Sequence, residues 1–188
     1  MRAKGWCEPV TVILINPNST ESMTLSAVEA ARVAAPDLQF EGWTSTEGPI
    51  VIQGAQDGSR AIPPLLKLVR EASDRKPLAI IIACFDDTGL AEAQRIASCP
   101  VIGIGQASFT MAGLFSGPSA VITTVAEAVP VITSNVVRQG YSQTISQVVA
   151  AHVPVLMLTN DPDTALQRFL DAAHQLPNET RNIILGCS

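Results

Sequence analysis

The chain has 188 residues, of which 47% are hydrophobic, and a formal net charge of −5 at pH 7. That length and apolar content can bury a core in one domain or in two small similar ones. The 12 Lys and Arg are scattered along the chain, which argues against nucleic acid as a partner. The longest apolar runs are far shorter than the ~20 residues of a membrane-spanning helix, and no signal-peptide core precedes the first expected strand. We therefore expect a cytoplasmic protein that does not contact a membrane.

Short runs rich in Val and Ile alternate along the chain with segments compatible with helices. In chain order, strands are expected at residues 10–15, 38–44 (a weaker pattern), 78–83, 100–104, 120–124, 153–158 and 182–185. Helices are expected at residues 21–35, 56–72, 90–97, 106–115, 126–139 and 164–175. Continuous apolar strands separated by helices are typical of parallel sheets buried on both faces, so the pattern predicts an α/β fold.

The polar ends of the expected strands indicate two halves of similar topology. In the first half, one strand ends at Asn16 and a later one at Cys84. In the second half, one strand ends at Thr123 and Thr124, and a later one ends just before Cys187. We predict a first half over residues 1–105 and a second over residues 106–188. Ligands of open α/β sheets bind at the carboxyl ends of the strands, so the two halves should form one cleft with a thiol on either wall.

Two opposed thiols suit a proton transfer at carbon. One thiol can remove a proton from a carbon next to a carbonyl while the other delivers a proton to the opposite face. A helix amino terminus after Cys84 is expected to lower the pKa of its thiol, whereas a carboxylate of Asp86 or Asp87 facing the sulfur would raise that pKa. The alternative is that Cys84 is a small buried residue at a strand end.

The remaining cysteines and histidines do not suggest a metal or disulfide site. The four cysteines are widely spaced without a CxxC pair, which indicates reduced thiols. Cys7 is expected to be incidental, and Cys99 to serve packing. His152 and His174 are isolated, so no metal is expected.

Other polar turns are candidates for holding a carbonyl or carboxylate. Asn16 is one, and Thr123 and Thr124 are two more. Ser19 or Thr20 is expected to cap the helix that follows it. Gly48-Pro49 is either a plain turn or a wall of the cleft. Gly103-Ile104-Gly105 is half of a dinucleotide fingerprint without its third glycine, so we expect no nicotinamide cofactor.

An ordered set of segments resembles the Asp/Glu/hydantoin racemase superfamily, and within it the hydantoin and allantoin racemases most. The segments are residues 12–20 with Met23-Thr24, Gly48-Pro49, residues 83–90, residues 100–105, residues 122–124 and residues 185–187. Each fragment alone is weakly diagnostic, but together they span almost the whole chain in the family's order.

The resemblance implies two pseudo-symmetric halves, each a parallel sheet flanked by helices, with the active site between them. It makes Cys84 and Cys187 the catalytic acid/base thiols, each deprotonating one enantiomer. The substrate-binding residues that it implies are Asn16, Gly48, Pro49, Phe85, Thr123 and Thr124. It further implies no metal, pyridoxal phosphate or nucleotide cofactor, a homo-oligomer, and 5-substituted hydantoins, allantoin or related amino-acid derivatives as substrates.

The chain departs from the family pattern after Cys187. In the family this cysteine is usually followed by a turn, a helix, a strand and a closing helix, whereas here Ser188 is the last residue. We therefore expect either a fragment or shortened form, or an impaired second acid/base, because a terminal carboxylate next to Cys187 would raise the pKa of its thiol. In both cases we expect less activity than in a complete relative. The alternative functions are a decarboxylase or cis–trans isomerase of the same superfamily, or an inactive binder of small carboxylates or ureides.

Overall fold

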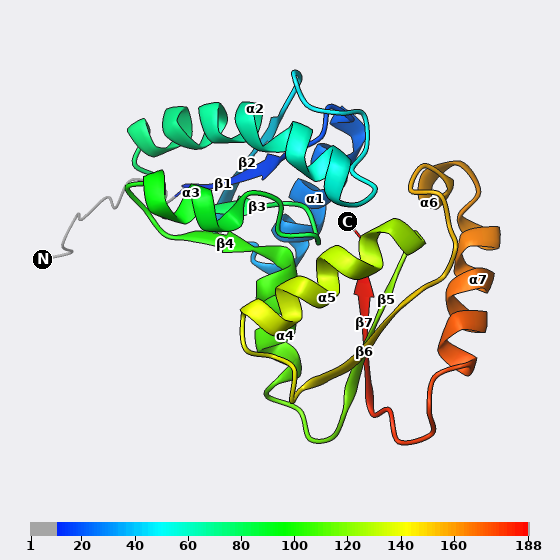
Figure 1. Ribbon diagram of the computed structural model, residues 1–188. Coiled ribbons are helices and arrows are strands. Elements are labelled where there is room, and N and C mark those ends of the chain that lie inside the picture. Colours follow the sequence, from blue (N-terminus) through cyan, green and yellow to red (C-terminus); the bar gives the residue numbers. More distant parts are fainter. Residues whose placement is uncertain (1–10, 188) are drawn as a thin grey trace, which may run out of the picture.

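The computed structural model describes residues 11–187, which form two separate parallel sheets with helices against them (Figure 1). The first sheet takes its strands from residues before Ile104, where α4 (Ile104–Ala112) begins, and the second from residues after it. Both sheets are purely parallel, as the buried apolar strands predict. The expected α/β fold of two helix-flanked halves is therefore confirmed.

The first half alternates strands and helices in strand order β2-β1-β3-β4. Its elements are β1 (Thr11–Asn16), α1 (Glu21–Ala34), β2 (Gln39–Thr44), α2 (Ala55–Asp74), β3 (Ala79–Ile82), α3 (Leu90–Ile96) and β4 (Val101–Gly103). One face of the sheet packs Ile13 and Ile15 against Leu65 and Val69 of α2. The other face packs its apolar side chains against Val28 of α1, so helices cover both faces.

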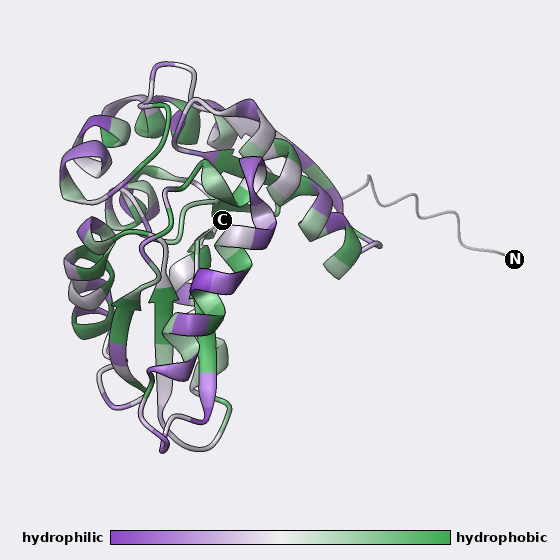
Figure 2. Cartoon of the chain, turned by 90° about the vertical axis from the view of Figure 1, so that its right-hand side faces the viewer, coloured by the Kyte–Doolittle hydropathy of each residue, from purple (hydrophilic) through white to green (hydrophobic). Residues whose placement is uncertain are grey.

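The second half is built around β5, which lies between two neighbours in the order β6-β5-β7. After α4 come β5 (Ser119–Thr123), the 3₁₀ helix η1 (Ala126–Ala128), α5 (Val129–Arg138), β6 (Ile145–Ala150), α6 (Met157–Asn160), α7 (Pro162–His174) and β7 (Asn182–Gly186). Figure 2 shows apolar green along much of the strands and mixed colours on the helices. This division is typical of sheets buried beneath amphipathic helices.

One expected strand is wrong. Residues 153–156 form a loop, and residues 157–158 are the start of α6. Besides β7, the strand that pairs with β5 is β6, which the sequence did not indicate. Pro154 has no N–H for a strand ladder, and His152, two residues earlier, has a φ of 55°. Val153 and Val155 are buried all the same, as loop residues. The edge strand β6 is only partly buried and carries polar residues, so its pattern is weak.

A phenylalanine of the first half belongs to the core of the second. Phe85, which follows β3 and Cys84, is packed with Phe109 of α4 and with Val121 of β5. The rings of Phe85 and Phe109 meet edge to face, with centroids 5.7 Å apart. The two halves are thus joined by apolar packing directly beside Cys84.

Among residues 11–187, no helix combines the length and the apolar character needed to cross a membrane.

Because Phe109 is fully buried and contacts Phe85 and Tyr141, Phe109→Ala should lower the free energy of unfolding by about 3–5 kcal/mol. Leu114→Ala is the matched control, since Leu114 is 74% exposed, and it should change that free energy by less than about 0.5 kcal/mol. Urea unfolding followed by circular dichroism measures both values. Equal losses in the two variants would contradict this account of the core.

Candidate active site

The two cysteines that the sequence singles out lie on one small cavity between the halves. Cys84 follows the end of β3 and Cys187 follows the end of β7. The cavity has a volume of about 30 Å³. Its lining consists of Asn18, Met23, Ile52, Ala83, Cys84, Phe85, Asp86, Thr123, Thr124, Ala128, Val155, Gly186 and Cys187. The strand ends of both sheets therefore bring two thiols and several polar groups to one place.

The structure places Phe85, Thr123 and Thr124 on this lining, but not Asn16, Gly48 or Pro49. Asn16 is buried behind it, and its Nδ2 atom donates to Asn18 Oδ1 at 2.9 Å and to the Thr20 carbonyl at 3.1 Å. Asn18 lines the cavity instead. The sequence motif identified this loop but could not say which of its two asparagines faces the cysteines.

The Gly48-Pro49 turn supports the loop that carries Asn18. A Cβ at Gly48 would lie 2.5 Å from the Pro17 carbonyl oxygen, so this close approach requires glycine. The Ser19 backbone N–H donates to the Pro49 carbonyl at 2.8 Å.

The expected side-chain cap of α1 is wrong. Thr20 stands at the N-cap position without a side-chain capping bond, and its hydroxyl donates to the Ile50 carbonyl at 2.7 Å.

Thr123 and Gly186 fix the strand end that precedes Cys187. The Thr123 hydroxyl donates to the Gly186 carbonyl at 2.9 Å. A Cβ at Gly186 would lie 2.9 Å from a Val121 methyl carbon and 3.1 Å from the Phe85 ring. A glycine here lets Phe85 pack against β7, which ties the backbone before Cys187 to the residue after Cys84.

The thiol of Cys84 has a raised pKa, of about 12. Burial is the main cause, the negative charge of Asp86 adds to it, and a contact of 3.4 Å with the Thr88 hydroxyl opposes it. The expectation that a helix amino terminus lowers this pKa is wrong, because α3 begins only at Leu90 and the sulfur is desolvated. Cys84 is therefore a neutral thiol at neutral pH in this structure.

Asp86 and Asp87 have different surroundings although they are neighbours in the chain. Burial and the charge of Asp87 raise the pKa of Asp86 to about 7, and its Oδ2 atom is buried without a hydrogen-bond partner. Burial also raises the pKa of Asp87, but its carboxylate accepts from the Gly105 N–H and from Gln139 Nε2, both at 3.0 Å. Asp86 is thus the carboxylate whose charge acts on Cys84.

Gly103 and Gly105 make room for the Asp87 carboxylate. A Cβ at Gly105 would lie 2.4 Å from the Phe85 carbonyl oxygen, and one at Gly103 would lie 2.0 Å from Asp87 Oδ1. The two glycines therefore leave space for residues of the Cys84 loop (residues 83–89). The first turn of α4 donates a backbone hydrogen bond to the carboxylate of Asp87 in this loop. The sequence pattern showed the two glycines but did not indicate that they accommodate Asp87.

The other predicted features fall outside this cavity. Cys99 packs against the core of the first half, as expected. Within residues 11–187 no group of three or more His, Cys, Asp or Glu is placed to hold a metal ion. Cys7 lies outside the described residues.

Comparisons with known proteins agree with the fold and with the family that the sequence motifs resemble. The family model described as Asp/Glu/Hydantoin racemase matches residues 12–188. The chain belongs to this family. It is 37% identical over 178 residues to a hydantoin racemase of Rhizobium meliloti, covering 93% of this chain and 74% of the relative.

Solved structures share the fold of this racemase. An allantoin racemase from Klebsiella pneumoniae superposes with a TM-score of 0.89 at 28% identity, over 95% of this chain and 74% of the other. A glutamate racemase from Francisella tularensis superposes with a TM-score of 0.67 at 14% identity, over 95% of this chain and 68% of the other, and this likeness shows the fold alone.

The raised pKa of Asp86 makes stability depend on pH. Its pKa is about 7 in the folded protein and 3.8 ordinarily, so the unfolded chain loses this proton first as the pH rises. The free energy of unfolding should therefore fall between about pH 4 and pH 7, by up to about 4 kcal/mol from this group alone. Asp86→Asn should remove this part of the fall.

Urea titrations of both proteins at pH 5 and pH 8 measure the difference. Asp87, whose pKa is also raised, remains in the variant, so part of the pH dependence persists there. Parallel pH dependences in the two proteins would contradict the assignment to Asp86.

Proposed function

We propose that this racemase acts on 5-substituted hydantoins, allantoin included, with Cys84 and Cys187 as its two proton-transfer groups and without a metal or organic cofactor. The observation that carries the proposal is that the two thiols line one cavity from opposite halves of the molecule. The similarity to a hydantoin racemase and to an allantoin racemase supports the choice of substrate.

The reaction needs one thiolate and one thiol on opposite faces of the substrate carbon. The thiolate takes the proton from the carbon next to the ring carbonyl, and negative charge develops on the carbonyl oxygen. The thiol then delivers its proton to the other face, and the carbon is inverted. After the reaction, the two cysteines have exchanged their protonation states, so the enzyme is ready for the opposite enantiomer.

Hydrogen-bond donors on the cavity wall suit the developing oxyanion. The Asn18 Nδ2 atom donates at 3.6 Å to the sulfur of Met23, a weak acceptor that a substrate oxygen would replace. The Oδ1 atom of the same amide accepts from Asn16 and from the Thr20 N–H, which fixes its orientation. Asn18 is thus held with its NH₂ group available to the substrate.

The substrate requires more space than the cavity offers in this structure. About 30 Å³ holds roughly one or two water molecules, whereas a substituted hydantoin ring is several times larger. Phe85 and Asp87 anchor the Cys84 loop to the second half, so that wall is fixed. The opposite wall carries Val155, in the loop before α6. The backbone N–H of Val153 donates to the Thr124 carbonyl at 2.8 Å, and we infer that the part of the loop beyond Val153 moves to admit substrate.

Cys84→Ser and Cys187→Ser should each lower the racemisation rate by at least about 100-fold, because each removes one of two acid/base groups. Cys99→Ser is the matched control and should retain the rate, since Cys99 packs in the first core away from the cavity. The assay follows optical rotation and exchange of the ring C–H in heavy water, with each enantiomer of allantoin and of several 5-substituted hydantoins.

Undiminished racemisation in either active-site variant would overturn the two-thiol mechanism. Exchange with retained configuration in the unaltered protein would point to one working cysteine. The absence of both exchange and racemisation on all of these compounds would overturn the proposed substrate class.

The raised pKa of Cys84 predicts a rate that increases with pH. The competent enzyme carries one thiolate, and the fraction of Cys84 thiolate grows as the pH approaches its pKa of about 12. Asp86→Asn removes a negative charge near the sulfur, so it should shift the alkaline rise in kcat/KM to lower pH. Profiles of kcat/KM from pH 6 to pH 10 measure the shift, and an unmoved rise would show that the charge of Asp86 does not act on catalysis.

A further inference from the structure

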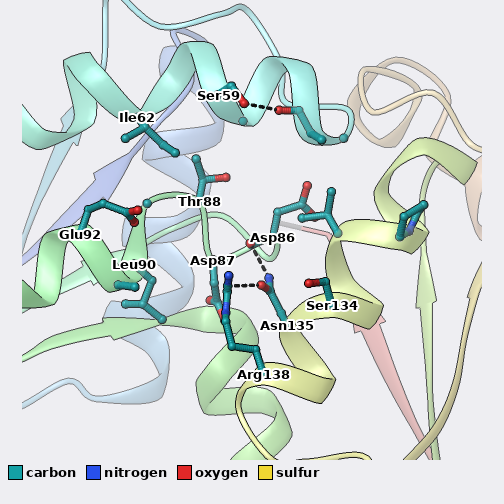
Figure 3. Close-up of a pocket in the computed structure, with 17 residues that line it drawn as sticks. Ser59, Ile62, Asp86, Asp87, Thr88, Leu90, Glu92, Ser134, Asn135 and Arg138 are labelled. Atoms are coloured by element: carbon teal, nitrogen blue, oxygen red, sulfur yellow. Dashed lines mark hydrogen bonds between the residues drawn. The ribbon is translucent and has the colours of Figure 1, made fainter.

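A second and larger hollow lies behind the Cys84 loop, between α2 and α5 (Figure 3). It has a volume of about 410 Å³. Its walls are the start of α2, the loop after Cys84 with the first turn of α3, and α5. They carry Gly54, Ala55, Gly58, Ser59, Ile62, Asp86, Asp87, Thr88, Gly89, Leu90, Ala91, Glu92, Pro130, Val131, Ser134, Asn135 and Arg138. Asp86 is the residue that lines both this hollow and the cysteine cavity.

Most charged and amide groups around the hollow already have partners. Asp87 accepts from Gly105 and Gln139, and Asn135 Nδ2 donates to the Asp86 carbonyl at 2.7 Å. Figure 3 shows that bond and the contact of Arg138 with Asn135 Oδ1. In addition, Glu92 forms an ion pair with Arg95, with 3.6 Å between Glu92 Oε1 and Arg95 Nη2.

The carboxylate of Asp86 is the exception. The residue is only 9% exposed, and its Oδ2 atom has no hydrogen-bond partner. A buried carboxylate oxygen without a donor is destabilising. Because Asp86 lines the hollow, its carboxylate gains a strong charge-assisted bond if it turns toward a ligand there that supplies a donor. Beside it, Ile62, Leu90 and Val131 provide apolar surface.

We propose that this hollow is a second small-molecule site, which takes a compound with an amidinium, guanidinium or ammonium group on a small apolar body, the cation pairing with Asp86. The volume is within the range of about 300–1,000 Å³ that is typical of ligand pockets. A planar amidinium offers parallel N–H groups that match the two oxygens of a carboxylate.

Occupancy of this site acts on Cys84. The charge of Asp86 helps to raise the pKa of the Cys84 thiol, and a cation bound to that carboxylate cancels much of its field at the sulfur. The ligand therefore lowers the pKa of Cys84 and shifts the alkaline rise in kcat/KM to lower pH. This consequence rests on the proposed function, whereas binding itself does not.

Binding depends on pH through Asp86, which is half protonated at about pH 7. The other charged and titratable groups that line the two cavities are Asp87, Glu92 and Arg138 around the larger one, and Cys84 and Cys187 around the smaller one. Only the carboxylate form attracts a cation, so the affinity should increase several-fold from pH 6 to pH 8.

Benzamidinium is a suitable probe, because it joins an amidinium to a small apolar ring. Gly58→Leu adds a side chain to the hollow from α2, where a Cβ at Gly58 meets only Thr88 Oγ1, at 4.0 Å. Gln56→Leu is the matched control, since Gln56 is an exposed residue of the same helix that does not line the hollow. Asp86→Asn keeps the shape of the side chain and removes its charge.

Isothermal titration calorimetry with benzamidinium at pH 8 should show saturable binding to the unaltered protein and to Gln56→Leu. The affinity should fall at least tenfold in Gly58→Leu and in Asp86→Asn, and benzoate, which has the opposite charge, should not bind. Absence of binding at millimolar concentrations, or equal affinity in Gly58→Leu and Gln56→Leu, would overturn the proposal.

The racemisation assay keeps this test separate from the proposed function. Gln56→Leu lies outside both cavities and should racemise at the unaltered rate. An active enzyme that does not bind benzamidinium would refute the second site alone, and a chain that binds it without racemising would refute the function alone.

Discussion

The structure depends on how the segment after Cys84 is held between the two halves. Phe85 enters the apolar core of the second half, where it meets Phe109 edge to face. Asp87 follows with a φ of 47° and places its carboxylate at the first turn of α4. Asn135 of α5 donates to the carbonyl of the residue between them. Apolar packing, a helix amino terminus and a buried amide thus fix one short segment, and with it the position of the Cys84 thiol.

This anchoring explains why several distant small residues matter to the site. Gly105 and Gly186 lie on different elements, and each gives space to part of this segment: the Phe85 carbonyl and Asp87 carboxylate in one case, the Phe85 ring in the other. Because β7 packs against that ring, Phe85 helps to position both the backbone that leads to Cys187 and the Cys84 residue that precedes it. The relative position of the two thiols is therefore set by packing between the halves.

Burial also creates the main electrostatic tension in the site. It holds Cys84 as a thiol and leaves Asp86 partly protonated near neutral pH, although each group would be more acidic in water. Asp87 escapes much of this penalty through its hydrogen bonds to α4 and Gln139. Asp86, the carboxylate without such hydrogen bonds, is therefore the one that lines both the cysteine cavity and the larger hollow. A ligand that pairs with it would change the pKa of the Cys84 thiol. Perturbed groups of this kind are typical of functional sites.

The sequence by itself determined the alternation of strands and helices, the two halves and the two cysteines at strand ends, because these follow from local apolar patterns and from chain order. It did not determine β6, whose edge position leaves its apolar pattern weak. It instead favoured a strand at residues 153–158, whose valines are buried outside any strand.

Only the tertiary structure decided which of two neighbouring residues faces the cysteines: Asn18 rather than Asn16, and Asp86 rather than Asp87. Their orientations are fixed by partners far along the chain, such as Gln139 for Asp87. It also decided the pKa of Cys84, because desolvation depends on everything packed around the sulfur, which no local pattern records.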